Sequence, residues 1–181
     1  MRKLTIISLI LMGLTGCAGR ELTDVTLVET LGVDGPGPVA LTAVGLDYGE
    51  TTLYRTQGET VAEAQESLKS QGDTRLEVTH VAQLVLGESS HVADTLWREV
   101  VHRKSGYGAT VWLTDGSAAD LLEQGSDPSR RLKSLEENGG VHAPTILEAL
   151  SALVREGRVA LPVLAFDRGE LTLAGYREVT G

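Results

Sequence analysis

Cys17 is the only cysteine among 181 residues, and its thiol is the strongest nucleophile that the sequence offers. A lone cysteine excludes a disulfide bond within the chain. The small residues Thr15 and Gly16 directly precede it and leave room for a peptidase to reach the backbone. The residue types and their order predict cleavage between Gly16 and Cys17, with attachment of a diacylglyceryl group to the Cys17 sulfur.

The segment before this thiol has the composition of a secretion signal. Arg2 and Lys3 form a short positive segment, and an apolar run, Leu4–Leu14, follows. The run is shorter than the about 20 apolar residues that cross a bilayer, so it indicates a targeting segment and not a structural helix. Leu14–Cys17 then matches the lipobox of bacterial lipoprotein signal peptides. The alternative is a chance cysteine at the end of an ordinary signal peptide.

Three regions are expected from this pattern. They are a lipoprotein signal peptide over residues 1–16, a lipidated tether over 17–24 and one folded domain over 25–181. A domain of that length is large enough to bury a core of its own. Each buried CH₂ of an acyl chain contributes about 0.8 kcal/mol, so two or three chains anchor a protein stably where one does not. The sequence therefore predicts a protein that lipid holds at a membrane.

Charge and aromatic content exclude one class of partner. The formal net charge is −9 for the full sequence, and an acidic surface repels nucleic acids and anionic membranes. Two Trp, four Tyr and one Phe are too few for a platform on which bases stack. We therefore expect no nucleic-acid partner. The acidity is compatible with a basic protein partner or simply with solubility.

The histidines do not form a catalytic or metal-binding pattern. His80, His91, His102 and His142 are not spaced as metal ligands, and no HExxH or CxxC motif occurs. His91 and His102 lie about three turns apart on one predicted helix. There is no nucleophile elbow, P-loop or dinucleotide-binding glycine motif. We expect no catalytic residue, metal or cofactor, and we expect His80 to be a packed core residue.

Two acidic and two aromatic residues have alternative interpretations. Asp24 and Asp34 are candidates for a partner interface, but aspartate routinely caps helices and stabilises turns, and this second interpretation is favoured. Trp97 and Trp112 are candidates for surface anchors. Trp97 fits the apolar stripe of a predicted helix and Trp112 lies in a predicted strand, so we expect both in the core.

These residues need a scaffold, and its clearest part is a helix followed by a strand within Gly58–Glu88. Thr60 and Glu63 have the spacing of a capping box. Apolar residues then recur at helical spacing up to a break at residues 71–73. The nearly unbroken apolar run Val78–Leu86 predicts a central strand that is covered on both faces.

The other segments complete an α/β domain. A β-hairpin is expected over 25–33 and 38–47 around a turn at 34–37, with a helical turn near 22–28 as an alternative, and 48–58 shows no clear element. Four more helices are expected: two that begin at Ser89 and Ser117, one over Ser129–Glu137 and one from Thr145 to Gly157. Three more strands are expected over Ala109–Thr114, Arg158–Phe166 and Glu170–Val179. Pro162 places its strand at an edge or a bulge, because proline has no N–H to donate. The fold class is α/β, a mixed β-sheet with helices packed against it.

Several motifs, taken in order, resemble the N-terminal domain of GerC-type (Ger(x)C family) spore germination lipoproteins. The motifs are the opening Arg20–Asp34, the helix–strand unit that ends in Leu86-Gly87-Glu88, and Leu171–Gly175 near the end. They are spread over nearly the whole chain, and their order and spacing are more specific than any one of them. Proteins of this family usually continue with further domains, and they often carry a Trp where Ala18 stands.

The resemblance implies a non-enzymatic lipoprotein subunit of a spore nutrient germinant receptor. Such a subunit would be anchored by lipid at the outer face of the cytoplasmic membrane, the spore inner membrane, with integral membrane subunits as its partners. Two other hypotheses stay open: a free-standing surface lipoprotein that binds a small ligand, and a lipoprotein hydrolase. The hydrolase would need a pocket in which His80 or His142 meets a carboxylate and a serine.

Overall fold

The computed structural model describes residues 25–47, 50–71, 75–102 and 106–181, which hold eight strands and five helices. The expected signal peptide and tether, including Gly16, Cys17 and Asp24, lie outside the described residues. The strands are β1 (Val25–Asp34), β2 (Val39–Asp47), β3 (Glu50–Gly58), β4 (Arg75–Glu77), β5 (Gln83–Leu86), β6 (Thr110–Thr114), β7 (Arg158–Asp167) and β8 (Glu170–Thr180). The helices are α2 (Val61–Lys69), α3 (Val92–His102), α4 (Ala118–Gln124), α5 (Pro128–Glu137) and α6 (Ile146–Glu156).

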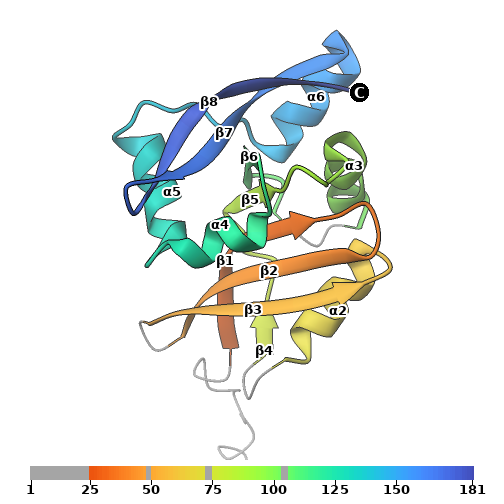
Figure 1. The fold of residues 1–181 in the computed structure, drawn as a ribbon. Helices are drawn as coiled ribbons and strands as arrows, with labels where there is room; N and C mark the ends of the chain where they lie inside the picture. Colours follow the sequence, from red (N-terminus) through yellow and green to blue (C-terminus); the bar gives the residue numbers. More distant parts are fainter. Residues whose placement is uncertain (1–24, 48–49, 72–74, 103–105) are drawn as a thin grey trace, which may run out of the picture.

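The strands form one mixed sheet in the order β3-β2-β1-β5-β6-β7-β8, and the short β4 pairs with β1. Strands β1, β5, β6 and β7 run parallel to one another, while the β2–β3 hairpin and β8 add antiparallel strands at the two edges (Figure 1). The helices and the sheet confirm the α/β fold class that the sequence predicts.

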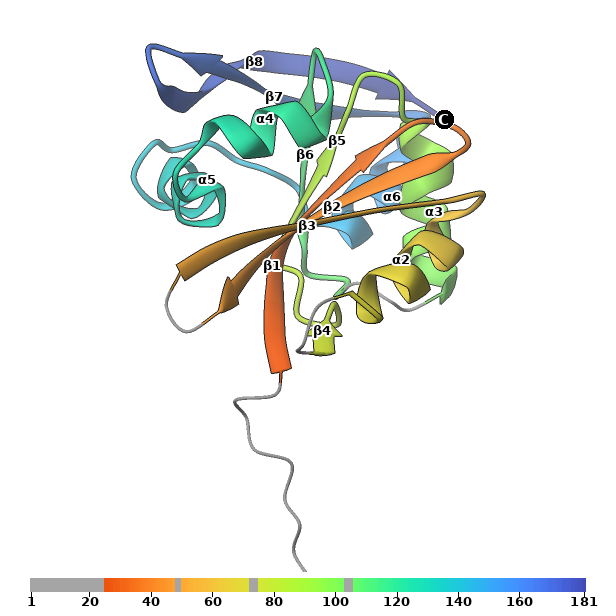
Figure 2. The same cartoon turned by 60° about the horizontal axis from the view of Figure 1, so that its bottom comes forward.

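Each face of the sheet packs against its own set of helices. Helices α2, α3 and α6 cover one face, and α4 and α5 cover the other, as Figure 2 shows. Parallel strands require cover on both faces because their side chains are apolar on both. β6 illustrates this, since Val111 and Leu113 enter the first core while Trp112 enters the second.

The N-terminal hairpin is confirmed, but its third strand was not predicted. β1 and β2 pair antiparallel around the expected turn, and the alternative of a helical turn is wrong for residues 25–28, which are strand. β3 occupies most of the segment in which the sequence shows no clear element. Its side chains are mostly polar and half-exposed because β3 is an edge strand, so it lacks the apolar pattern of a buried one.

The predicted central strand Val78–Leu86 is too long, since only its last four residues are strand β5. The chain turns at Thr79 and His80 instead, and the Glu77 side chain accepts a hydrogen bond from the Thr79 N–H at 3.2 Å. Val78 and Val81 are buried all the same. An apolar run therefore indicated burial correctly, although it could not distinguish a strand from a loop that dips into the core.

The ends of α2, α4 and α6 agree closely with the sequence, whereas α3 begins at Val92, three residues after the expected Ser89. The Thr60, Ser117 and Thr145 hydroxyls accept hydrogen bonds from the backbone N–H groups three residues later. These bonds satisfy N–H groups that have no partner within their own helix. Gly157 ends α6 in the left-handed region, with φ at 72°.

Pro162 lies next to an irregularity in β7, one of the two expected settings. β7 is an interior strand, and its register with β8 shifts between Val163 and Leu164. Its pairing with β6 begins at Val163, so the missing N–H of Pro162 falls before the parallel ladder begins.

The capping box of α6 gives a pH-dependent contribution to stability. Hydrogen bonds to the Glu148 carboxylate from the Thr145 N–H and then from its hydroxyl, at 2.8 and 2.9 Å, lower the pKa of Glu148 below its usual value. A depressed carboxyl pKa stabilises the fold above the unfolded-state pKa, and this contribution is lost as the pH falls through the folded-state pKa. We expect Glu148→Gln to lower the urea unfolding midpoint at neutral pH and to match the wild type in acid.

The matched control is Glu156→Gln, which changes an exposed glutamate at the other end of α6. Its difference from the wild type should not vary with pH. If the urea unfolding midpoints of Glu148→Gln and the wild type differed by the same amount at neutral and acidic pH, the capping explanation would be contradicted.

Candidate functional site

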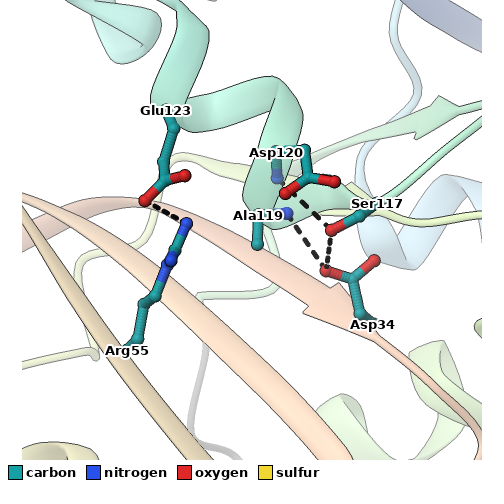
Figure 3. A network of polar contacts seen from close by, with 6 residues as sticks. All are labelled: Asp34, Arg55, Ser117, Ala119, Asp120 and Glu123. Carbon is teal, nitrogen blue, oxygen red and sulfur yellow. Dashed lines mark hydrogen bonds and ion pairs between the residues drawn. The ribbon is translucent and has the colours of Figure 1, made fainter.

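The carboxyl ends of β1, β5 and β6 meet at one edge of the sheet, where Asp34 organises the loops. Asp34 Oδ1 accepts a hydrogen bond from the Ala118 N–H at 2.8 Å. Asp34 Oδ2 accepts from the Ala119 N–H and the Ser117 hydroxyl at 3.0 Å each (Figure 3). The two N–H groups belong to the first turn of α4 and have no partner within that helix. A carboxylate beside them stabilises the positive end of the helix dipole. Asp34 therefore caps α4 from a distant strand.

Gly87 makes room for this carboxylate. A Cβ atom at Gly87 would overlap Asp34 Oδ1 and lie 3.1 Å from the Gly116 carbonyl oxygen. The Gly87 N–H donates to the Val33 carbonyl at 2.9 Å, and the Glu88 N–H donates to the Gly116 carbonyl at 2.9 Å. The three strand ends are thus hydrogen-bonded to one another, and a side chain at Gly87 would force the Asp34 carboxylate to move.

An ion pair ties α4 to the sheet beside this network. Arg55 of β3 pairs with Glu123 of α4 (Figure 3). Both side chains are about half-exposed, and exposed pairs contribute little to stability. In open α/β sheets ligands commonly bind outside the carboxyl ends of the strands, but here both carboxylate oxygens of Asp34 are occupied by the cap. An interface role for Asp34 stays a prediction.

The three histidines whose side chains the structure describes are exposed and come from separate segments. His80 lies in the turn before β5, His91 directly before α3 and His142 in the loop before α6. The prediction that His80 is a core residue is wrong, because the expected strand is interrupted there by a turn. The His102 side chain lies outside the description. Among the residues that the structure places, no three His, Cys, Asp or Glu side chains gather closely enough to hold a metal ion.

The two tryptophans have opposite environments. Trp112 is fully buried beneath α4 and α5, and its Nε1–H donates to Thr110 Oγ1 at 3.1 Å. Trp97 is 57% exposed, so the prediction of a core position is wrong for it. The neighbouring Leu96 is completely buried, and α3 turns Trp97 away from the core that Leu96 enters.

A second group of polar residues surrounds a cavity of about 570 Å³ between α5 and the amino ends of β5 and β6. We call it the polar cavity. Its lining residues are Glu29, His80, Ala82, Gln83, Gly108, Thr110, Ser129, Arg130, Lys133, Glu136 and Glu137. Both carboxylates and cationic side chains are present, and this mixture could orient a ligand that carries both charges.

A buried hydrogen-bond network lies beneath the polar cavity, and two of its members, Gln83 and Ser129, line the cavity. Thr30 Oγ1 donates to Gln83 Oε1 at 2.8 Å and lies 2.8 Å from Ser129 Oγ. Thr30, Gln83 and Ser129 are 0%, 5% and 3% exposed. Buried polar groups are costly unless they are hydrogen-bonded, so this network fixes α5 on β1 and β5 in one register.

A β-bulge supplies the acidic wall. The pairing of β1 with β2 shifts register between Val28 and Thr30, which leaves Glu29 as the extra residue. The Glu29 carbonyl accepts a hydrogen bond from the Ala82 N–H at 2.8 Å. Bulges re-aim side chains, and this one places Glu29 at the polar cavity beside the strand position from which Thr30 reaches α5.

Sequence reasoning found Asp34 but missed the polar cavity. Its residues come from four segments that are far apart in the chain, and none belongs to a recognised motif. One signal was present: Gln83 is the polar residue of the otherwise apolar and fully buried strand β5, and a polar residue inside an apolar strand indicates a specific buried partner.

Comparison with known proteins adds no identification: no family model, no curated protein and no solved structure matches this chain. Within the described ranges, no helix is long and apolar enough to cross a membrane. Function is therefore inferred from the residues and their geometry.

Proposed function

We propose that this chain is a membrane-anchored, non-enzymatic lipoprotein that serves as a subunit of a spore nutrient germinant receptor. The observation that carries the proposal is the lipobox Leu14–Cys17, which the sequence places just before the domain that opens with β1. The eight residues from Cys17 to Val25 extend at most about 26–29 Å. A lipid on Cys17 would thus keep the domain close to integral membrane subunits at the outer face of the cytoplasmic membrane.

The geometry at Asp34 supports the resemblance to GerC-type lipoproteins. Two of the motifs that carry the resemblance end in Asp34 and in Leu86-Gly87-Glu88. They lie about fifty residues apart in the chain, yet the Asp34 carboxylate occupies the space beside Gly87. The two motifs therefore meet at one edge of the sheet, where a side chain at Gly87 would displace the Asp34 carboxylate.

The hydrolase hypothesis meets one of its requirements and lacks another. The polar cavity holds His80 together with Ser129 and several carboxylates. Ser129 is 3% exposed, however, and its hydroxyl is engaged with Thr30 Oγ1. A catalytic serine needs a base within hydrogen-bond reach and access to substrate, and the buried hydroxyl has its contact with a threonine instead.

The alternative of a small-ligand-binding surface lipoprotein is favoured by one observation, the polar cavity itself. Binding pockets are concave and carry a few well-placed polar groups, and this cavity has a buried polar network beneath it. The two functions are compatible, because the cavity lies on the α5 side of the sheet and its lining does not include Asp34.

Removal of the thiol tests the anchor. We expect Cys17→Ala to shift the protein from the membrane fraction to the soluble fraction by at least about tenfold, because the transfer of acyl chains into lipid supplies the membrane affinity. Fractionation and metabolic labelling with palmitate measure this result. Gly16→Ala, which keeps a small residue before the thiol, should stay labelled and bound. A Cys17→Ala variant that remains in the membrane fraction would show that the lipobox interpretation is wrong.

The receptor role has its own test. The intact, lipidated protein is isolated from spore membranes, and the proteins that co-purify are identified by mass spectrometry. Recovery of multi-spanning membrane proteins in constant proportion supports a receptor subunit. A protein that is abundant and lipidated but co-purifies with no membrane protein would contradict the receptor role and leave the anchor intact.

A further inference from the structure

We propose that Leu27 and Leu46 form a second contact with the membrane, in which their side chains insert into the phospholipid surface beside the acyl anchor. We call these two residues the leucine pair. The inference rests on the proposed lipidation of Cys17 and goes beyond it, because it assigns the end of the domain that faces the bilayer. The partner is lipid and not an integral membrane subunit.

The leucine pair is exposed although it belongs to a sheet face that elsewhere forms a core. Leu27 and Leu46 are directly opposite each other in the β1–β2 ladder, so their Cβ atoms lie about 4.5–5.5 Å apart on one face of the sheet. Val44, two residues before Leu46 and therefore on the same face, is buried in the core beneath α4 and α5. Leu27 is nevertheless 48% exposed and Leu46 is 49% exposed. The pair thus continues an apolar face into solvent.

The pair is exposed because α4 and α5 cover only the later part of β1. α5 meets β1 at Thr30, whose Oγ1 lies 2.8 Å from Ser129 Oγ. α4 covers the next part of the strand, where a Cβ atom at Gly32 would lie 2.8 Å from Leu122 Cδ1. Leu27 precedes both contacts in β1. The strands therefore extend past their helices toward the start of β1.

The position of the pair relative to the anchor selects lipid as its partner. Leu27 is the third residue of β1, and the eight residues from Cys17 to Val25 extend at most about 26–29 Å. The two most exposed large apolar side chains among the described residues, Leu147 and Val154, belong to α6. Figure 1 shows α6 and the start of β1 at opposite ends of the molecule. A lipid on Cys17 would therefore hold the leucine pair, and not the apolar residues of α6, next to the bilayer.

The size of the pair also favours lipid over a protein partner. Stable protein–protein interfaces bury about 1,200–2,000 Å² in total, and two half-exposed leucines supply a small part of such an area. A shallow contact with lipid needs no matching surface. The anchor keeps the pair at a high effective concentration near the bilayer, so a weak contact is enough to orient the domain.

The charges near the pair indicate an apolar contact and not an electrostatic one. Glu29 of β1 and Glu50 of β3 are exposed near this end of the sheet, and Arg75, which pairs with Val25, is the exposed cation of β4. Carboxylates are repelled by anionic headgroups. We therefore expect the contact to form in neutral phosphatidylcholine bilayers and to be insensitive to added salt.

The test measures the depth of a spin label in the full, lipidated chain, which is reconstituted in phosphatidylcholine vesicles that hold no other protein. Leu27→Cys and Leu46→Cys each add one free thiol, because lipid occupies the Cys17 sulfur. Val154→Cys is the matched control, since Val154 is 78% exposed but lies on α6. Paramagnetic resonance compares collisions of each label with oxygen and with a water-soluble nickel complex. We expect both leucine labels about 5–10 Å into the boundary between headgroups and acyl chains, and the Val154 label in water.

A charged residue on one member of the pair tests the pair as a unit. With the label at Leu27→Cys, the added substitution Leu46→Asp should move the label into water, because a carboxylate opposite it resists transfer into lipid. Val154→Asp should leave the label depth unchanged. Unfolding midpoints equal to that of the parent protein establish that these variants are folded.

Three results would overturn the proposal. The first is leucine labels that meet the nickel complex as often as the Val154 label does. The second is insertion that requires anionic lipid. The third is labels that leave water only in spore membranes, which would assign the pair to a protein partner.

Failure of the anchor is recognised separately. A parent chain that takes up the spin label at Cys17 has a free thiol, and the anchor then fails together with this inference. A parent chain that takes up no label and floats with the vesicles retains the anchor, so that aqueous leucine labels overturn this inference alone.

Discussion

Replacing Gly87 by alanine is expected to lower the free energy of unfolding by about 2–4 kcal/mol. The added Cβ overlaps Asp34 Oδ1 and approaches the Gly116 carbonyl, so either the carboxylate or the β5 end must move. Overpacking of this kind costs about 1–3 kcal/mol, and loss of a helix cap costs about 1 kcal/mol more. Urea unfolding followed by circular dichroism measures the change.

Gly116→Ala is the matched control for Gly87→Ala. Gly116 belongs to the adjacent loop, but a Cβ there has no atom within 4 Å, so its cost should be a few tenths of a kcal/mol. The double variant Asp34→Ala with Gly87→Ala should be more stable than Gly87→Ala alone, because the carboxylate oxygen that the new methyl group would overlap is absent. Equal unfolding midpoints for the two glycine variants would contradict the proposed fit.

Local signals predicted local structure well in this chain. The caps at Thr60, Ser117 and Thr145 each depend on residues three positions apart, and the structure shows all three bonds. The reciprocal bond of Glu63 goes to the Glu59 N–H and not to Thr60, a displacement of one residue that spacing alone does not resolve. Capping chemistry is decided within one turn, which is why a single sequence reveals it.

Features that depend on tertiary partners were harder to predict. The boundary of β5 depends on a turn that Glu77 stabilises, and β3 exists because β2 offers it a ladder along its full length. The polar cavity needs a bulge at Glu29 and the docking of α5 through Ser129. Periodicity reports which residues are buried, but it does not report which segments meet.

The exposure of Trp97 shows the same limit on a single helix. An apolar stripe at helical spacing includes residues at its margin, and the sequence does not say whether a neighbouring element covers that margin. In the structure Leu96 is buried and Trp97 is 57% exposed. The two tryptophans, which the sequence assigned to the same environment, therefore provide an internal comparison.

Trp112→Ala is expected to lower the free energy of unfolding by about 3–5 kcal/mol, whereas Trp97→Ala should change it by less than about 0.5 kcal/mol. Trp112 is fully buried and packs in the core beneath α4 and α5, so its removal leaves a large cavity. Trp97 lies mainly in solvent. Urea unfolding measured by circular dichroism compares the two variants without depending on the fluorophore that each removes.

Trp112→Phe separates packing from hydrogen bonding. Phenylalanine keeps much of the buried volume but lacks the N–H that bonds to Thr110 Oγ1, so it should lose less stability than alanine does. If Trp97→Ala proved as costly as Trp112→Ala, the exposed position of Trp97 would be wrong.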